Sequence, residues 1–246
     1  MSNLSYGNSL SWLAFAFNVG LNLSQLPLMR QMLLDTEAFA DPALAAKYKA
    51  APAINQIVTA GMWLSYAAAV LPSNTALFAN NVIGLAAALL YVAAFLYARP
   101  SAREKARVAL AALAALATPA LIYASLYAPA PPRAARDAWA SALTTLITAA
   151  FWASPLVALR AAVRDLDAAR VPVPLTLLML CTTATWLAVG VFIGDITLIV
   201  CSAIGVFFSA LQLAALGFIA AAARGAGKGA AGGAGAGAAL AVGVGV

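Results

Sequence analysis

Long apolar runs, each about 20 residues or more, alternate with short polar segments along almost the whole chain. A run of about 20 apolar residues is long enough to cross the hydrocarbon core of a bilayer as an α-helix. The pattern therefore predicts an all-α membrane protein with seven transmembrane helices. By residue number, the predicted spans are 9–31, 52–71, 75–98, 108–128, 138–159, 172–194 and 196–222.

The composition supports this prediction. Of the 246 residues, 64% are hydrophobic and only 9% are charged, whereas a soluble domain carries about 25% charged residues. So much apolar surface cannot be buried in a water-soluble globule. These values exclude a large soluble enzyme, a nucleic-acid-binding protein and a disordered regulator. The expected partner of the apolar surface is the lipid bilayer.

The distribution of Lys and Arg predicts the orientation in the membrane. With the N-terminus outside and the C-terminus in the cytosol, 12 of the 14 basic residues lie on the inner side, and only Arg133 and Arg136 lie outside. Cytoplasmic loops of membrane proteins carry an excess of Lys and Arg. We therefore expect a multi-pass protein with a cytosolic C-terminus, in the plasma membrane rather than an internal membrane. Residues 223–246, almost all Ala, Gly and Val, are expected to form a disordered cytosolic tail.

The polar and proline positions repeat in the same order in two parts of the chain. The first set is Ser24, Gln25, Pro27, Pro52, Trp63, Asn81 and Gly84. The second set is Ser154, Pro155, Pro172, Trp186, Ser202 and Gly205. Each set covers three spans, which predicts two three-helix repeats at 9–98 and 138–222. Residues 99–128, with the fourth span, have no counterpart and are predicted to be a linker that lets the two repeats run parallel (3-1-3).

The residues inside the spans limit the chemistry. The chain has no histidine, and its eight acidic residues lie in loops or at span ends. Ion-coupled carriers and proton relays place Asp, Glu or His inside the bundle, so the sequence favours uncoupled transport. No metal site, cofactor site or catalytic set is predicted, and we expect no enzyme activity. Cys181 and Cys201 both fall in apolar runs and are interpreted as packed core residues.

Several of these motifs resemble the SWEET family of sugar transporters (MtN3/saliva type, in its eukaryotic seven-helix form). Ser154-Pro155-Leu156 is similar to that family's Ser-Pro-Leu in the fifth span. Pro52, Trp63 and Tyr66 follow the order of its second span, and Asn81 and Gly84 follow its Asn-x-x-Gly. The chain departs from most plant members at Gln25, which replaces a proline, and at Ser202, which replaces an asparagine.

The resemblance implies roles for three groups of residues. The implied substrate-binding residues are Trp63, Asn81, Trp186 and Ser202. The implied hinge and inner-gate residues are Gln25, Pro27, Pro52, Pro155 and Pro172. The implied outer gate is Tyr66 with Asp195. Each group also has a structural interpretation: packed tryptophans, amides that join helices, prolines at helix starts and a solvated turn carboxylate. Gln212 is expected to bond across helices.

The sequence thus predicts a bidirectional uniporter that carries a mono- or disaccharide by alternating access. An aromatic ring can stack on the apolar face of a pyranose, while amides and hydroxyls bind its edge. A PQ-loop-type transporter of an amino acid or another small solute is the alternative. A seven-helix receptor or photoreceptor is a weaker alternative. A photoreceptor that binds retinal would need a lysine in the last span, and residues 196–222 contain none. One seven-span chain encloses a complete pathway, and assembly as a dimer or trimer stays open.

Overall fold

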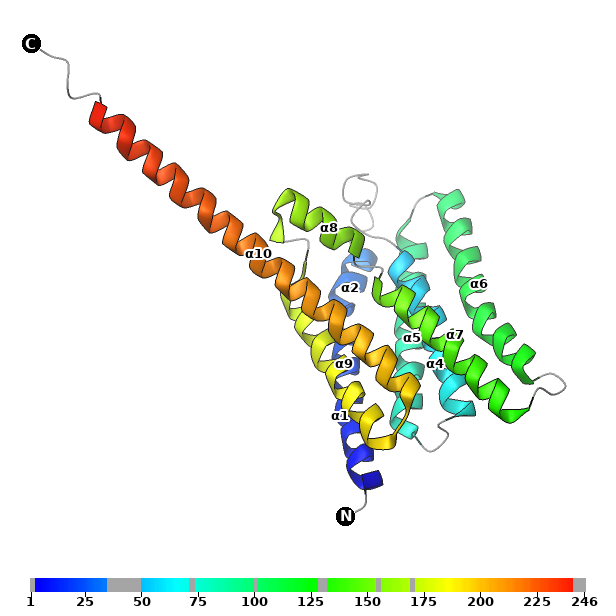
Figure 1. Cartoon of the computed structure of the whole chain (residues 1–246). Helices are drawn as coiled ribbons and strands as arrows, with labels where there is room; N and C mark the ends of the chain where they lie inside the picture. Colours follow the sequence, from blue (N-terminus) through cyan, green and yellow to red (C-terminus); the bar gives the residue numbers. More distant parts are fainter. Residues whose placement is uncertain are drawn as a thin grey trace, which may run out of the picture.

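The computed structural model describes residues 3–34, 50–70, 74–99, 101–127, 132–153, 156–168 and 171–240, and these ranges fold as helices without strands (Figure 1). The helices are α1 (Asn3–Leu23), α2 (Leu26–Leu34), α4 (Ala51–Ala69), α5 (Thr75–Ala98), α6 (Ala102–Tyr127), α7 (Arg133–Ala153), α8 (Leu156–Asp165), α9 (Val173–Ile193) and α10 (Ile196–Leu240). The predicted all-α class is confirmed. Within these ranges, four helices are long and apolar enough by themselves to cross a membrane, at Thr75–Ala98, Ala102–Ser125, Val173–Ile193 and Ile196–Ala222.

The first and fifth predicted spans are each built from two helices rather than one. In the first, α1 ends at Leu23 and α2 begins at Leu26, with a turn at Ser24 and Gln25. Pro27 accounts for this break, because it has no N–H to donate to the carbonyl of Leu23 and its ring crowds the preceding turn. In the fifth, α7 and α8 are separated at Ser154 and Pro155, which lie outside the described residues.

The packing of the helices repeats between the two halves of the chain. In the described chain, α5 packs against α1, α2 and α4, while α10 packs against α7, α8 and α9. Between the halves, α1 packs against α9 and α4 packs against α7. Exchanging α1 with α7, α2 with α8, α4 with α9 and α5 with α10 leaves this set of pairs unchanged. α6 has no counterpart and packs against α4, α5 and α7.

The same capping arrangement opens the third helix of each half. The Asn74 side-chain oxygen accepts a hydrogen bond of 3.0 Å from the backbone N–H of Leu77 at the start of α5. The Asp195 carboxyl accepts one of 2.7 Å from the N–H of Leu198 at the start of α10. Asn and Asp are favoured here because they satisfy N–H groups that have no partner within the helix. Gly194, at φ 73°, makes the turn between α9 and α10.

The buried apolar residues form three clusters that differ in what they join. One lies near the ends of the helices at the Asp195 turn and includes Ala14, Tyr66, Leu77, Ala140 and Val189, from both halves. A second belongs to α2, α4, α5 and α6, and a third to α8, α10 and Val171. We call the first region the closed end and the opposite region, where α2 and α8 lie, the α2–α8 end (Figure 1). Buried apolar residues thus join the two halves at the closed end, whereas the clusters at the α2–α8 end each stay on one side.

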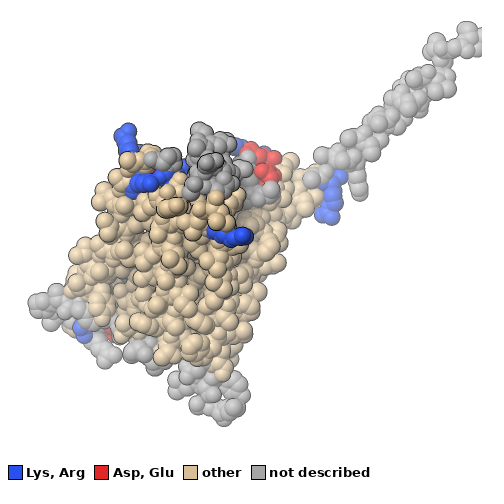
Figure 2. Space-filling model, turned by 180° about the vertical axis from the view of Figure 1, so that it is seen from behind, with Lys and Arg blue, Asp and Glu red and all other residues tan. Residues whose placement is uncertain are grey.

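The outer surface is that of a protein embedded in lipid. Large apolar side chains such as Leu90, Leu110, Leu121, Leu146 and Phe207 are more than 60% exposed. A broad band of the surface in Figure 2 is free of charged residues, and most of the visible Lys and Arg side chains gather at the α2–α8 end. One predicted internal contact is confirmed: the Thr176 hydroxyl lies 3.1 Å from the side-chain oxygen of Gln212, which joins α9 to α10.

The last helix is longer than predicted. α10 does not end at residue 222 but continues to Leu240 and projects away from the body (Figure 1). The expectation of a disordered tail thus differs from the structure over 223–240, and 241–246 lie outside the described residues. Glycine, which shares this stretch with alanine, has a low helix propensity, so the composition does not explain the continuation.

We expect Gly190→Ala to destabilise the protein by about 1–3 kcal/mol, the usual cost of overpacking. A Cβ at Gly190 would stand 2.9 Å from the backbone nitrogen of Ile199, and that backbone cannot move aside without disturbing the α9–α10 pair. Gly217→Ala on α10 is the matched control, because a Cβ there meets nothing within 4 Å. It should stabilise the helix by about 0.5–1 kcal/mol. Thermal unfolding of the purified variants measures both, and equal midpoints would contradict the close packing.

Candidate functional site

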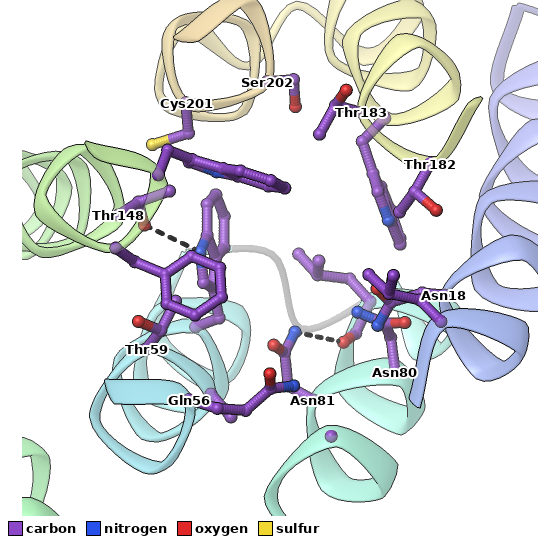
Figure 3. A pocket seen from close by; sticks show the side chains of 18 of the residues that line it. Asn18, Gln56, Thr59, Asn80, Asn81, Thr148, Thr182, Thr183, Cys201 and Ser202 are labelled. Carbon is purple, nitrogen blue, oxygen red and sulfur yellow. Dashed lines mark hydrogen bonds between the residues drawn. The ribbon is translucent and has the colours of Figure 1, made fainter. Parts of the chain in front are cut away.

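A cavity of about 120 Å³ lies where the two halves meet, between α1, α4 and α5 on one side and α7, α9 and α10 on the other (Figure 3). Its polar lining consists of Asn18, Gln56, Thr59, Asn80, Asn81, Thr148, Thr182, Thr183, Cys201 and Ser202. Its aromatic lining consists of Trp63, Phe151, Trp152 and Trp186. The lining includes no Asp, Glu, Lys or Arg, so the cavity combines hydrogen-bonding groups with aromatic surface and carries no formal charge.

The structure brings the four predicted substrate-binding residues together in this cavity. Trp63 and Asn81 reach it from α4 and α5, and Trp186 and Ser202 reach it from α9 and α10. All four are buried, with exposed fractions between 5% and 8%. The Asn81 side-chain amide donates to the carbonyl of Leu77 at 2.8 Å, one turn earlier in its own helix. Their equivalent places in the two repeats account for this convergence.

A hydrogen bond between the halves forms one wall of the cavity. The indole N–H of Trp63, on α4, donates to the hydroxyl of Thr148, on α7, at 3.0 Å (Figure 3). Both side chains are buried. An indole N–H in an apolar interior needs a partner, so this bond holds the Trp63 ring in one orientation against the cavity.

Between the cavity and the closed end, the two predicted outer-gate residues are joined by a hydrogen bond. The Tyr66 hydroxyl donates to the Asp195 carboxyl at 2.7 Å, which ties α4 to the α9–α10 turn. Tyr66 is 2% exposed and Asp195 is 9% exposed, so the interpretation of Asp195 as a solvated turn carboxylate is wrong. The Tyr66 ring also meets Trp63 edge to face, with ring centroids 5.5 Å apart. This contact links the closed end directly to the cavity wall.

The predicted hinge residues lie away from the cavity, near the α2–α8 end. Pro27 and Pro52 are the second residues of α2 and α4, Pro172 caps the start of α9, and all three are exposed. Gln25 is half-buried in the turn between α1 and α2. Pro155 lies outside the described residues. Prolines at these positions fit helix starts, where a missing N–H costs little, and their role as hinges stays a prediction.

Several lining residues were missed by the sequence prediction, among them Asn18, Gln56, Asn80, Thr148 and Thr182. The repeat carries a signal for some of them. Asn18 precedes Ser24 by six residues, as Thr148 precedes Ser154, so the two side chains occupy equivalent places on α1 and α7. Asn80 and Cys201 stand in the same relation, each directly before a predicted binding residue. Among the described residues, no three His, Cys, Asp or Glu side chains gather as a metal site would require.

We expect the Tyr66–Asp195 contact to stabilise the protein by about 1–3 kcal/mol, as for other buried hydrogen bonds to a carboxyl group. Tyr66→Phe removes the donor and keeps the ring, while Asp195→Asn keeps an oxygen for the N–H of Leu198. Unfolding of both single variants and the double variant gives a coupling energy, expected to be about 0.5–3 kcal/mol for residues in contact. Tyr97→Phe, which changes a tyrosine that is 66% exposed, is the control and should have little effect. Strictly additive effects of the two substitutions would show that the contact contributes nothing.

Comparison with known proteins agrees with the arrangement described above. A structure of a eukaryotic SWEET transporter, determined at 3.7 Å resolution, superimposes with a TM-score of 0.76 at 18% identity, over 89% of this chain and 98% of that chain. This likeness establishes the fold. No curated protein matches the chain. The family described as "Sugar efflux transporter for intercellular exchange" matches residues 8–103 and 140–222, one segment in each predicted repeat. Since these segments cover well over half of its length, the chain belongs to this family, the SWEET (MtN3/saliva) family of sugar efflux transporters.

Proposed function

We propose that this protein is a uniporter that carries a neutral sugar across the membrane in both directions. The observation that supports this most is the uncharged cavity at the junction of the two halves, with Trp63 and Trp186 in its walls and amides and hydroxyls between them. This is the chemistry that a sugar needs, because its C–H faces stack on aromatic rings and its hydroxyls both donate and accept hydrogen bonds. Family membership supports the same substrate class.

Within that class, the cavity favours a monosaccharide. Its volume of about 120 Å³ is small beside the roughly 300–1,000 Å³ of typical drug-sized ligand sites. A disaccharide would need the closed end or the α2–α8 end to open further around it. We therefore expect a hexose to be a better substrate than sucrose.

Transport is proposed to follow alternating access, with the two three-helix repeats of a 3-1-3 arrangement rocking against each other. The symmetric helix pairs support two matching halves, and the cluster that joins them lies at one end. The Tyr66–Asp195 hydrogen bond then serves as the gate at the closed end. At the other end, Gln25, Pro27, Pro52, Pro155 and Pro172 are proposed to form the hinges and the inner gate. Prolines suit this role because each removes a backbone hydrogen bond that would stiffen the helix.

The absence of an ionisable carboxyl group among the residues that line the cavity supports uniport. Proton coupling needs a group that titrates on the pathway as the substrate moves. Asp195 lies at the closed end, where it already accepts hydrogen bonds from Tyr66 and from the N–H of Leu198. A cavity for an amino acid would also have to bind two charged groups, which this neutral lining is poorly suited to do.

The orientation is proposed to place the closed end outside the cell and the α2–α8 end in the cytosol. The exposed residues Arg30, Arg103 and Arg160 lie on α2, in the first turn of α6 and on α8. Figure 2 shows most of the visible Lys and Arg side chains at the α2–α8 end, in agreement with the positive-inside rule. We also propose that the protein lies in the plasma membrane and that it can assemble as a dimer or trimer.

Reconstituted protein should take up radiolabelled D-glucose into proteoliposomes with saturable kinetics, and sucrose more slowly. An imposed proton gradient should leave the initial rate unchanged within about twofold, because no Asp or Glu lines the cavity. Liposomes without protein measure the leak. Failure of folded protein to move either sugar would overturn the sugar assignment, and gradient-driven accumulation would replace uniport with coupled transport.

Asn81→Ala should reduce the uptake of glucose by about tenfold or more, because the cavity loses a polar side chain that faces the substrate. Asn55→Ala on α4 is the matched control, since it removes the same amide from an exposed position that does not line the cavity. Both variants are first checked for folding by size-exclusion chromatography. Equal uptake by the two variants would remove Asn81 from the proposed site.

A further inference from the structure

The two sides of the cavity differ in their polar chemistry, although the helices that form them are arranged symmetrically. The amide side chains, Asn18, Gln56, Asn80 and Asn81, all come from the first half. The second half contributes hydroxyls and a thiol but no amide, from Thr148, Thr182, Thr183, Ser202 and Cys201, and the first half adds one hydroxyl, from Thr59. Figure 3 shows the amides along one side of the cavity and the hydroxyls of α9 and α10 across from them. Amides offer both a donor and an acceptor, so the halves differ in what they can offer a ligand.

Much of the hydrogen-bonding capacity on the second side is already in use. The Thr182 hydroxyl donates to the carbonyl of Leu178 at 2.8 Å, and the Thr183 hydroxyl donates to the carbonyl of Met179 at 2.9 Å. These two protons are committed to the helix that carries them. Thr148, for its part, already accepts the bond from Trp63.

On the first side, Asn80 has an acceptor with no partner. Its side chain is only 7% exposed, it lines the cavity, and its oxygen Oδ1 makes no hydrogen bond in the described chain. It stands directly before Asn81 on α5, and Figure 3 places it between Asn81 and Asn18. A buried acceptor that lacks a donor is costly, so such a group in a cavity points to a ligand that brings the donor.

We propose that Asn80 is a specificity-determining residue, whose side-chain oxygen accepts a hydrogen bond from one hydroxyl of the transported sugar. This inference rests on the proposed function and adds to it an orientation for the substrate. The hydroxyl-bearing edge of the sugar faces the amides of α1, α4 and α5, while its C–H faces meet Trp63 and Trp186. Asn80 has no counterpart of its kind in the second half, because Cys201 occupies the equivalent place on α10.

The experiment compares D-glucose with its 2-, 3-, 4- and 6-deoxy and deoxyfluoro analogues, by equilibrium binding to purified protein and by uptake into proteoliposomes. Wild-type protein should lose about tenfold or more in affinity when one hydroxyl is removed, as expected when a buried group is left without its partner. The deoxyfluoro analogue at the same carbon should be equally poor, because fluorine cannot donate to the Asn80 oxygen. Asn80→Leu keeps the side-chain volume but removes the acceptor. In this variant, the affinities for glucose and for the deoxy and deoxyfluoro analogues modified at that carbon should agree within about twofold.

Cys201→Ala is the matched control, because it alters the equivalent position on the opposite wall. It should keep the preference of the wild-type protein for that hydroxyl, whatever its effect on overall uptake. A purely structural role for Asn80 would weaken the binding of glucose and all its analogues by the same factor in Asn80→Leu, and that result would overturn the proposal. Glucose binding and uptake by wild-type protein, with no hydroxyl preference lost in Asn80→Leu, would refute this inference and leave the sugar uniporter intact. A wild-type protein that neither binds nor moves any of these sugars would refute both.

Discussion

Polar side chains inside a bilayer cannot form hydrogen bonds with water, and the structure depends on how they are paired instead. Each must find a partner within the protein, or it remains a costly unpaired group. Most do so locally: Thr182, Thr183 and Asn81 bond to carbonyls of their own helices. A smaller number reach across, and two of these bonds, Trp63 to Thr148 and Tyr66 to Asp195, join the two halves. The cavity lining includes a group that lacks such a partner in the described chain, the Asn80 side-chain oxygen, so this need for a partner also favours a polar ligand there.

The bonds between the halves are unevenly distributed along the molecule. Tyr66, Asp195 and their apolar neighbours connect the halves at the closed end, whereas the clusters at the α2–α8 end stay within one side. The halves also meet along α1 and α9 and along α4 and α7. The Tyr66–Asp195 bond and its apolar neighbours are therefore the part of this interface that belongs to the closed end.

The helices and the cavity were predictable to different degrees. Apolar length predicts the spans, and the spacing of Pro52, Trp63 and Asn81 against Pro172, Trp186 and Ser202 placed four residues that converge in one cavity. The break at Ser24 and Gln25 was not predicted as two helices, because local propensity does not show whether a proline bends a helix or ends it. Asn80 was missed for another reason. Consecutive residues on a helix point about 100° apart, so only the packing around α5 shows that both asparagines face the cavity.

The symmetric arrangement of the helices and the asymmetric lining of the cavity have different consequences. Symmetric helix pairs, with matched caps at Asn74 and Asp195, let the two halves pack by the same rules. A symmetric lining would gain nothing from this, because a sugar has no twofold axis and its hydroxyls differ from one another. Amides on one wall and committed hydroxyls on the other suit such a ligand, since they offer unequal sets of donors and acceptors. On the proposed function, Ser202 and Cys201, which stand where the first half has Asn81 and Asn80, fit the lining to an asymmetric solute, and the symmetry of the scaffold serves the proposed movement.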